Sequence, residues 1–102
     1  MSERDTKLAL GEILESIAAI RSYMDGVSKD EFAARMLLQD AVIRRLEIVG
    51  EAANQLPDTV KDQFPEVEWR AITAMRNRLI HGYFGVNIEV VWKYRTAGPF
   101  DA

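Results

Sequence analysis

The central stretch of the chain, residues 38–53, reads LQDAVIRRLEIVGEAA and predicts a helix with two apolar sides. At 100° per residue, a broad arc covers one side and a narrow stripe covers the other, with charged residues between them. The broad arc consists of Phe32, Leu38, Val42, Ile43, Leu46 and Val49, and the narrow stripe of Leu37, Ala41, Ile48 and Ala52. A helix that buries two sides is either central in its own bundle or shared with a second subunit, and in so short a chain we predict a homodimer.

The flanking residues set the limits of this helix. Ser28 and Glu31 form an S-x-x-E capping box at its start, and Pro57 stops it. We therefore predict one continuous helix from Ser28 to about Gln55, roughly 40 Å long.

The rest of the chain also has helical periodicity. Apolar residues recur at three- and four-residue steps over residues 5–25, which predicts a first helix ended by Gly26. Its predicted core stripe is Leu10, Ile13, Leu14, Ile17, Ile20 and Met24. Three more helices are predicted: a short one capped by Asp58 and ending near Phe64, one from about Val67 to Ile80 or His81 with Gly82 as its C-cap, and one over residues 88–95 capped by Asn87. The fold class is therefore all-α, an up-and-down bundle of four to five helices in a single domain over residues 1–102, with an irregular tail from about residue 96.

The composition limits the chemistry of this domain. The 102 residues are 48% hydrophobic and 28% charged, which is typical of one globular domain. With no cysteine and one histidine, a disulfide framework and a thiolate metal site are excluded, and we predict no metal and no cofactor. No apolar run approaches the roughly 20 residues of a membrane span, and the start MSERD is too polar for a signal peptide, so we expect a cytoplasmic protein.

The formal net charge of −3 conceals a division of charge along the chain. Residues 1–68 carry 14 acidic and 8 basic side chains, whereas residues 69–102 carry 5 basic and 2 acidic ones. The basic ones are Arg70, Arg76, Arg78, Lys93 and Arg95. A locally positive segment on an acidic body favours a confined phosphate-binding cleft over a broad DNA-binding surface, and makes Arg70 and Arg78 candidate RNA contacts.

Arg76 is the first candidate for chemistry, because it projects from the centre of the apolar stripe of the fourth helix. That stripe is predicted to be Trp69, Ile72, Leu79 and Ile80. A guanidinium is a cation that is costly to bury unpaired, so Arg76 needs an anion. The anion is either a substrate phosphate or a carboxylate of the preceding long helix, such as Glu47 or Glu51, and the sequence leaves both open.

His81 is the second candidate. It follows Arg76 by five residues and therefore lies roughly 140° round the helix from it. Either the last turn loosens at Gly82 and brings the two side chains together, or two chains pool their residues across a symmetric interface. The second arrangement suits acid and base catalysis of phosphoryl transfer, which calls for two proton-transfer groups where each chain has one imidazole. The alternative is that His81 merely terminates a helix.

Aromatic residues follow this segment. Tyr83 and Phe84 stand between two glycines, where they either line the mouth of a cleft or fold back into the core. Trp92 and Tyr94 could stack on bases, but we expect Trp92 to pack inside the protein.

Residues 69–83, WRAITAMRNRLIHGY, resemble the signature of the HepT-like branch of the HEPN superfamily, which is Arg-x4-His-x-Tyr with an aromatic residue opening the helix and Asn directly after the Arg. Residues 44–53, RRLEIVGEAA, are similar to that family's long second helix, and the Phe64-Pro65-x3-Trp69 approach is also similar. The resemblance covers about residues 5–95.

This resemblance implies the toxin of a type VII-like toxin–antitoxin pair, a metal-independent endoribonuclease encoded beside an antitoxin that is a nucleotidyltransferase of the MNT type. By matching positions, Arg76 and His81 would be the catalytic pair and Asn77 their supporting neighbour. Tyr83 would accept AMP from ATP, which silences the toxin.

The C-terminus departs from the family pattern, because members usually continue with further helical sequence where this chain ends in TAGPFDA. Two competing interpretations stay open. One is a non-catalytic HEPN module that binds a nucleotidyltransferase partner or a nucleotide. The other is a purely structural helical dimer in which Arg76 pairs with Glu47 or Glu51.

Overall fold

The computed structural model describes residues 1–81 and 88–95, and this part of the chain is all-α, as predicted. Its helices are α1 (Glu3–Met24), α2 (Lys29–Ala34), α3 (Met36–Gln55), α4 (Asp58–Lys61), α5 (Trp69–His81) and α6 (Ile88–Lys93). The predicted caps at Gly82 and Asn87, the aromatic pair Tyr83 and Phe84, and the tail from residue 96 lie outside the described residues.

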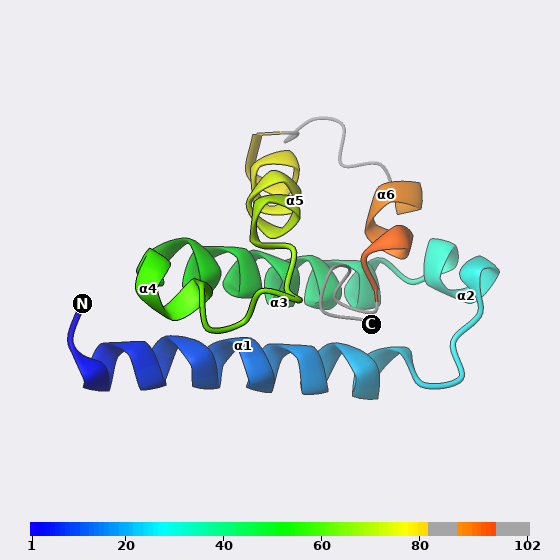
Figure 1. Cartoon of the computed structure of the whole chain (residues 1–102). Coiled ribbons are helices and arrows are strands. Elements are labelled where there is room, and N and C mark those ends of the chain that lie inside the picture. The colour runs from blue at the N-terminus through cyan, green and yellow to red at the C-terminus, as the bar shows by residue number, and fades with distance from the viewer. Residues whose placement is uncertain (82–87, 96–102) are drawn as a thin grey trace.

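Helix α3 is the central element. Helices α1 and α3 run side by side in opposite directions, and α5 stands across α3 on the side away from α1 (Figure 1). Helix α3 contacts α1, α2, α5 and α6. Much of its two-sided apolar pattern is therefore used within one chain: Ala52, from the predicted narrow stripe, is buried in the monomer, while Leu37 of the same stripe is 86% exposed.

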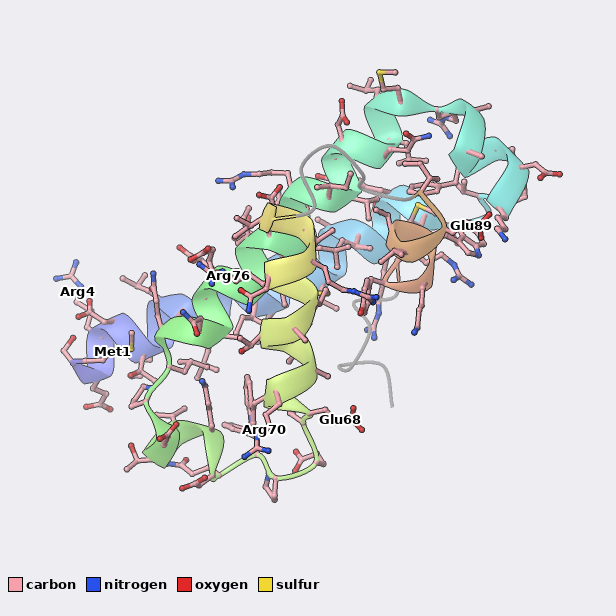
Figure 2. All side chains as sticks on the ribbon, turned by 90° about the horizontal axis from the view of Figure 1, so that it is seen from above. Met1, Arg4, Glu68, Arg70, Arg76 and Glu89 are labelled. Carbon is pink, nitrogen blue, oxygen red and sulfur yellow. The ribbon has the colours of Figure 1, made fainter. Side chains whose placement is uncertain are left out.

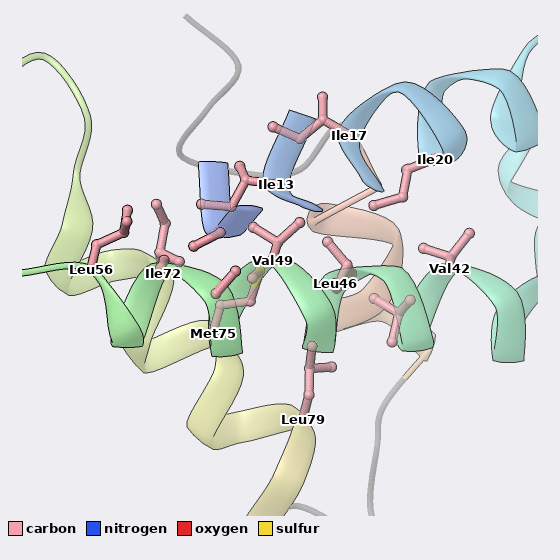
Figure 3. Packing of buried hydrophobic residues seen from close by; sticks show 14 of the residues in the cluster. Ile13, Ile17, Ile20, Val42, Leu46, Val49, Leu56, Ile72, Met75 and Leu79 are labelled. Atoms are coloured by element: carbon pink, nitrogen blue, oxygen red, sulfur yellow. The ribbon is translucent and has the colours of Figure 1, made fainter. Parts of the chain in front are cut away.

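The core lies between these three long helices (Figure 3). It is formed by Ile13, Ile17 and Ile20 of α1, Val42, Leu46 and Val49 of α3, and Ile72, Met75 and Leu79 of α5. Full burial of each such side chain contributes about 1.5–3 kcal/mol relative to exposure. One predicted core residue is wrong: Leu14 is 69% exposed, because it lies roughly 120° round α1 from the fully buried Ile20.

The predicted continuous helix over residues 28–55 is broken into α2 and α3. Arg35 leaves the helical conformation with φ −116° and ψ 87°. The side-chain amide of Gln39 donates to the carbonyls of Phe32 and Ala33 at 2.8 and 3.0 Å, so the break leaves these acceptors bonded. The break turns α2 back over the core, where the Phe32 ring lies 5.7 Å from the ring of Trp92. Ser28 does cap α2, accepting from the Glu31 amide at 3.1 Å.

The connection to α5 also differs from the prediction. Asp58 is the first residue of α4 and not its cap, and α4 ends at Lys61. Turns continue from there to Phe64, because the amides of Gln63 and Phe64 donate to the carbonyls of Val60 and Lys61. Helix α5 begins at Trp69, whose indole N–H donates to the Lys61 carbonyl at 3.1 Å and ties the loop to the helix start. None of the helices in the described part of the chain combines the length and the apolar character needed to cross a membrane.

Candidate active site

The candidate site lies where α5 crosses α3, beside the buried face of α5. That face is formed by Ile72, Met75 and Leu79. Met75 is the central buried residue that the predicted stripe missed, while the predicted Trp69 and Ile80 are only half-buried. The buried face is therefore shifted round the helix, and Arg76 lies at its edge next to α3 (Figure 2).

Gly50 of α3 makes the close approach of the two helices possible. A Cβ atom at this position would overlap Arg76 Cβ, lie 2.8 Å from Arg76 Cγ and lie 3.4 Å from Arg76 Cα. Any larger residue would push α5 away from α3. Sequence reasoning missed Gly50, although a glycine inside a helix costs about 0.5–1 kcal/mol relative to alanine and so indicates a packing reason.

The guanidinium of Arg76 is held by two side chains. Its Nε and Nη2 both lie 2.7 Å from Glu51 Oε1, and its Nη1 donates to Asn77 Oδ1 at 3.1 Å. Of the two candidate carboxylates, the structure therefore selects Glu51, as the competing structural interpretation of Arg76 anticipated. The Arg76 and Glu51 side chains are 24% and 43% exposed, and pairs this open to solvent contribute about 0.2–1 kcal/mol to stability. Stability alone is a weak reason for such a pair.

His81 is the last residue of α5, and the helix stays regular up to it. The backbone therefore keeps Arg76 and His81 roughly 140° apart round the helix axis. The structure does not describe the side chain of His81 or the residues from Gly82 to Asn87, so whether the turn loosens at Gly82 and where Tyr83 lies stay predictions.

The other arginines of α5 are not gathered beside Arg76. Arg78 is exposed and lies roughly 160° round the helix from Arg76. Arg70 is also exposed, about 9 Å along the helix axis, where it lines a separate hollow next to α4. Trp92 packs against the core as predicted, with the Arg95 guanidinium 3.9 Å from its ring centre.

A groove between α1 and α3 meets the Arg76 site at Glu51. It consists of two hollows of about 300 and 360 Å³ that share Glu12. The first is lined by Glu12, Glu15 and Ser16 of α1 and by Arg44, Arg45, Ile48 and Glu51 of α3. The hydroxyl of Ser16 is fully buried there and has no hydrogen-bond partner among the described residues.

The profile of the HepT-like ribonuclease family matches residues 13–97, a span that includes α3, Glu51, Arg76 and His81. The chain belongs to this family. The resemblance inferred from residues 69–83 is thereby confirmed, and the chain is that of a HepT-like ribonuclease.

Individual relatives of this HepT-like chain support the same family assignment. A Thermococcus cleftensis protein named "Probable ribonuclease HepT" is 41% identical over 91 residues, which cover 89% of this chain and 83% of that protein. A candidate RNase of Methanocaldococcus jannaschii is 38% identical over 92 residues, which cover 90% of this chain and 76% of that protein. No solved structure gives a significant match.

Proposed function

We propose that this HepT-like chain is the toxin of a type VII-like toxin–antitoxin pair, and that it cleaves RNA as a metal-independent endoribonuclease through Arg76 and His81. The observation that carries the proposal is the oriented guanidinium of Arg76 at the α3–α5 crossing, within an Arg-x4-His segment of a chain in this family. Asn77, which accepts from Arg76 Nη1, fits the supporting role.

The proposed reaction uses the 2′-hydroxyl of the RNA as the nucleophile. The bond between O2′ and phosphorus forms while the bond between phosphorus and O5′ breaks, leaving a cyclic phosphate and a 5′-hydroxyl. One proton leaves O2′ and another reaches O5′, and His81 side chains are the proposed acid and base. Arg76 stabilises the negative charge that builds on the phosphorane oxygens.

The test is cleavage of a labelled single-stranded RNA by the purified chain in EDTA, with the intact mass checked for added AMP. Cleavage ending in a cyclic phosphate supports the proposal. Absence of cleavage by a chain free of AMP would replace it with the non-catalytic module that binds a nucleotidyltransferase.

We further propose that the enzyme is a homodimer assembled through the α1–α3 groove, which would give each site a second imidazole. The groove's charges are self-complementary: Glu12 and Glu15 on α1 and Arg44 and Arg45 on α3 form no ion pair with other described residues. A two-fold axis would set the acids of one subunit against the arginines of the other. A partner subunit would also bring polar groups to the buried Ser16 hydroxyl, which is costly to leave unbonded.

Charge reversal tests this interface. We expect the double variants Arg44→Glu with Arg45→Glu, and Glu12→Arg with Glu15→Arg, each to sediment as monomers where the wild type is a dimer. An equimolar mixture should reassociate as heterodimers, because the groove that has gained acids then faces the groove that has gained arginines. Circular dichroism checks that both variants stay helical. A monomeric wild type, dimeric variants or a mixture that stays monomeric would remove the groove as the dimer interface.

We propose that Tyr83 accepts AMP from an MNT-type nucleotidyltransferase, and that this modification inhibits the toxin. Because Tyr83 is two residues from His81 in the sequence, a bulky adenylyl group on it would fill the catalytic cleft and present its phosphate to Arg76. We expect Tyr83→Phe to remain toxic to cells, to gain no mass from such an enzyme with ATP, and to escape silencing. Silencing of this variant through AMP on another residue would sink the role.

A further inference from the structure

We infer that Glu51 is the positioning residue of this active site: it holds one edge of the Arg76 guanidinium and leaves the opposite edge turned outward for the RNA phosphate. This inference rests on the proposed ribonuclease function and assigns a role to a side chain outside the Arg-x4-His segment.

The N–H groups of Arg76 carry the argument. A guanidinium has five N–H donors in one plane. Glu51 Oε1 takes the Nε–H and one Nη2–H, and Asn77 Oδ1 takes one Nη1–H. Two N–H groups, one on each Nη atom, have no partner in the part of the chain that the structure describes. Those on adjacent Nη atoms form the fork that binds two phosphate oxygens at once.

Two consecutive residues of α3 create this arrangement. Gly50 lets the backbone of α5 come close to α3 at Arg76. Glu51 then fixes the plane of the guanidinium through two contacts of 2.7 Å. Without Glu51, the guanidinium could rotate about its own side-chain torsions, and its outward fork would no longer point in one direction.

The alternative to a positioning role is an inhibitory one, a plug, in which the Glu51 carboxylate competes with the phosphate for the Arg76 guanidinium and must leave before the phosphate binds. The two roles predict opposite results. If Glu51 is a plug, removing it raises RNA affinity or turnover. If Glu51 positions Arg76, Glu51→Ala lowers turnover, whereas Glu51→Gln keeps an acceptor oxygen near Nε and retains most of it.

The experiment measures kcat and KM for an RNA oligonucleotide with the full-length chain. We expect Glu51→Ala to lower kcat about a hundredfold, the scale of a misplaced catalytic group, with KM changed less than about threefold. Glu51→Gln should stay within about fivefold of the wild type. The matched control is Glu47→Ala, one turn earlier on α3, where the carboxylate has no ion pair among the described residues.

A double-mutant cycle with Arg76→Ala separates positioning from general destabilisation. If Glu51 acts only through Arg76, Glu51→Ala has no further effect on kcat once Arg76 is alanine. Equal further loss in that background would mean a merely structural role and would overturn the inference. So would unchanged or increased turnover in Glu51→Ala.

Failure of the proposed function is recognised separately. If the wild type cleaves no RNA, binding of an oligonucleotide with 2′-deoxyribose, which cannot be cleaved by this route, replaces turnover as the readout. Binding weakened equally by Arg76→Ala, by Glu51→Ala and by both together would keep Glu51 as the positioning residue of a phosphate site. If Arg76→Ala or Glu51→Ala leaves the affinity for the oligonucleotide unchanged, the inference is overturned.

Discussion

His81→Ala is expected to remove RNA cleavage while leaving the fold intact. The chain has one imidazole, so the variant loses its only histidine for proton transfer, a contribution of about 10²–10⁴ in rate. His81 is the last residue of α5, where a substitution leaves the preceding turns of the helix unchanged, so we expect the free energy of unfolding to change by less than about 0.5 kcal/mol. The measurements are cleavage of labelled RNA in EDTA and thermal unfolding followed by circular dichroism.

The control for this prediction is Glu68→Ala, an exposed carboxylate just before α5, which should cleave at the wild-type rate. A loss of several kcal/mol in His81→Ala would make the histidine structural. Undiminished cleavage by the variant would remove His81 from the proposed mechanism.

The helical periodicity of the sequence was enough to predict the long helices and most of the core. Most of the predicted broad arc is buried, because its members repeat at helical spacing and their burial depends only on which side of the helix meets other helices. The exception is Ile43, which is half-buried. Helices α1 and α5, the predicted first and fourth helices, begin and end within two residues of their predicted bounds for the same reason.

The predictions fail where contacts with a distant part of the chain determine the local structure. No proline or glycine stands near Arg35, so local signals predict a continuous helix there. Two interactions stabilise the break. The side-chain amide of Gln39 donates to the carbonyl of Phe32, and the ring of Phe32 packs against the ring of Trp92. A helical repeat carries no information about a partner almost sixty residues away.

The same limit applied to the site. The sequence identified Arg76 and left Glu47 and Glu51 as equal candidates, since the two acids are four residues apart on one side of α3. The crossing of α5 over Gly50 decides between them, because it brings Arg76 to Glu51. The geometry of the crossing, and with it the orientation of the guanidinium, could not be obtained from residue spacing.

Gly50→Ala should destabilise the fold, because an added methyl group at this position has no room. The new Cβ would overlap Arg76 Cβ and lie 2.8 Å from Arg76 Cγ, and neither atom is the free end of a side chain that could swing away. Helix α5 must therefore move off α3, which loosens the burial of Met75 and carries Arg76 away from Glu51. Overpacking of this kind costs about 1–3 kcal/mol, against about 1 kcal/mol gained from alanine's helix propensity.

We therefore expect a net loss of stability together with a loss of cleavage as deep as that of Glu51→Ala, because both changes release the guanidinium of Arg76. The matched control is Gly11→Ala in α1, where a new Cβ meets nothing within 4 Å. It should raise the free energy of unfolding by about 0.5–1 kcal/mol and leave cleavage unchanged. Thermal unfolding and RNA turnover of the two variants are measured side by side. If Gly50→Ala gained stability as Gly11→Ala does, the two helices would not be in the close contact that holds Arg76 against Glu51, and the orientation of the guanidinium would need another cause.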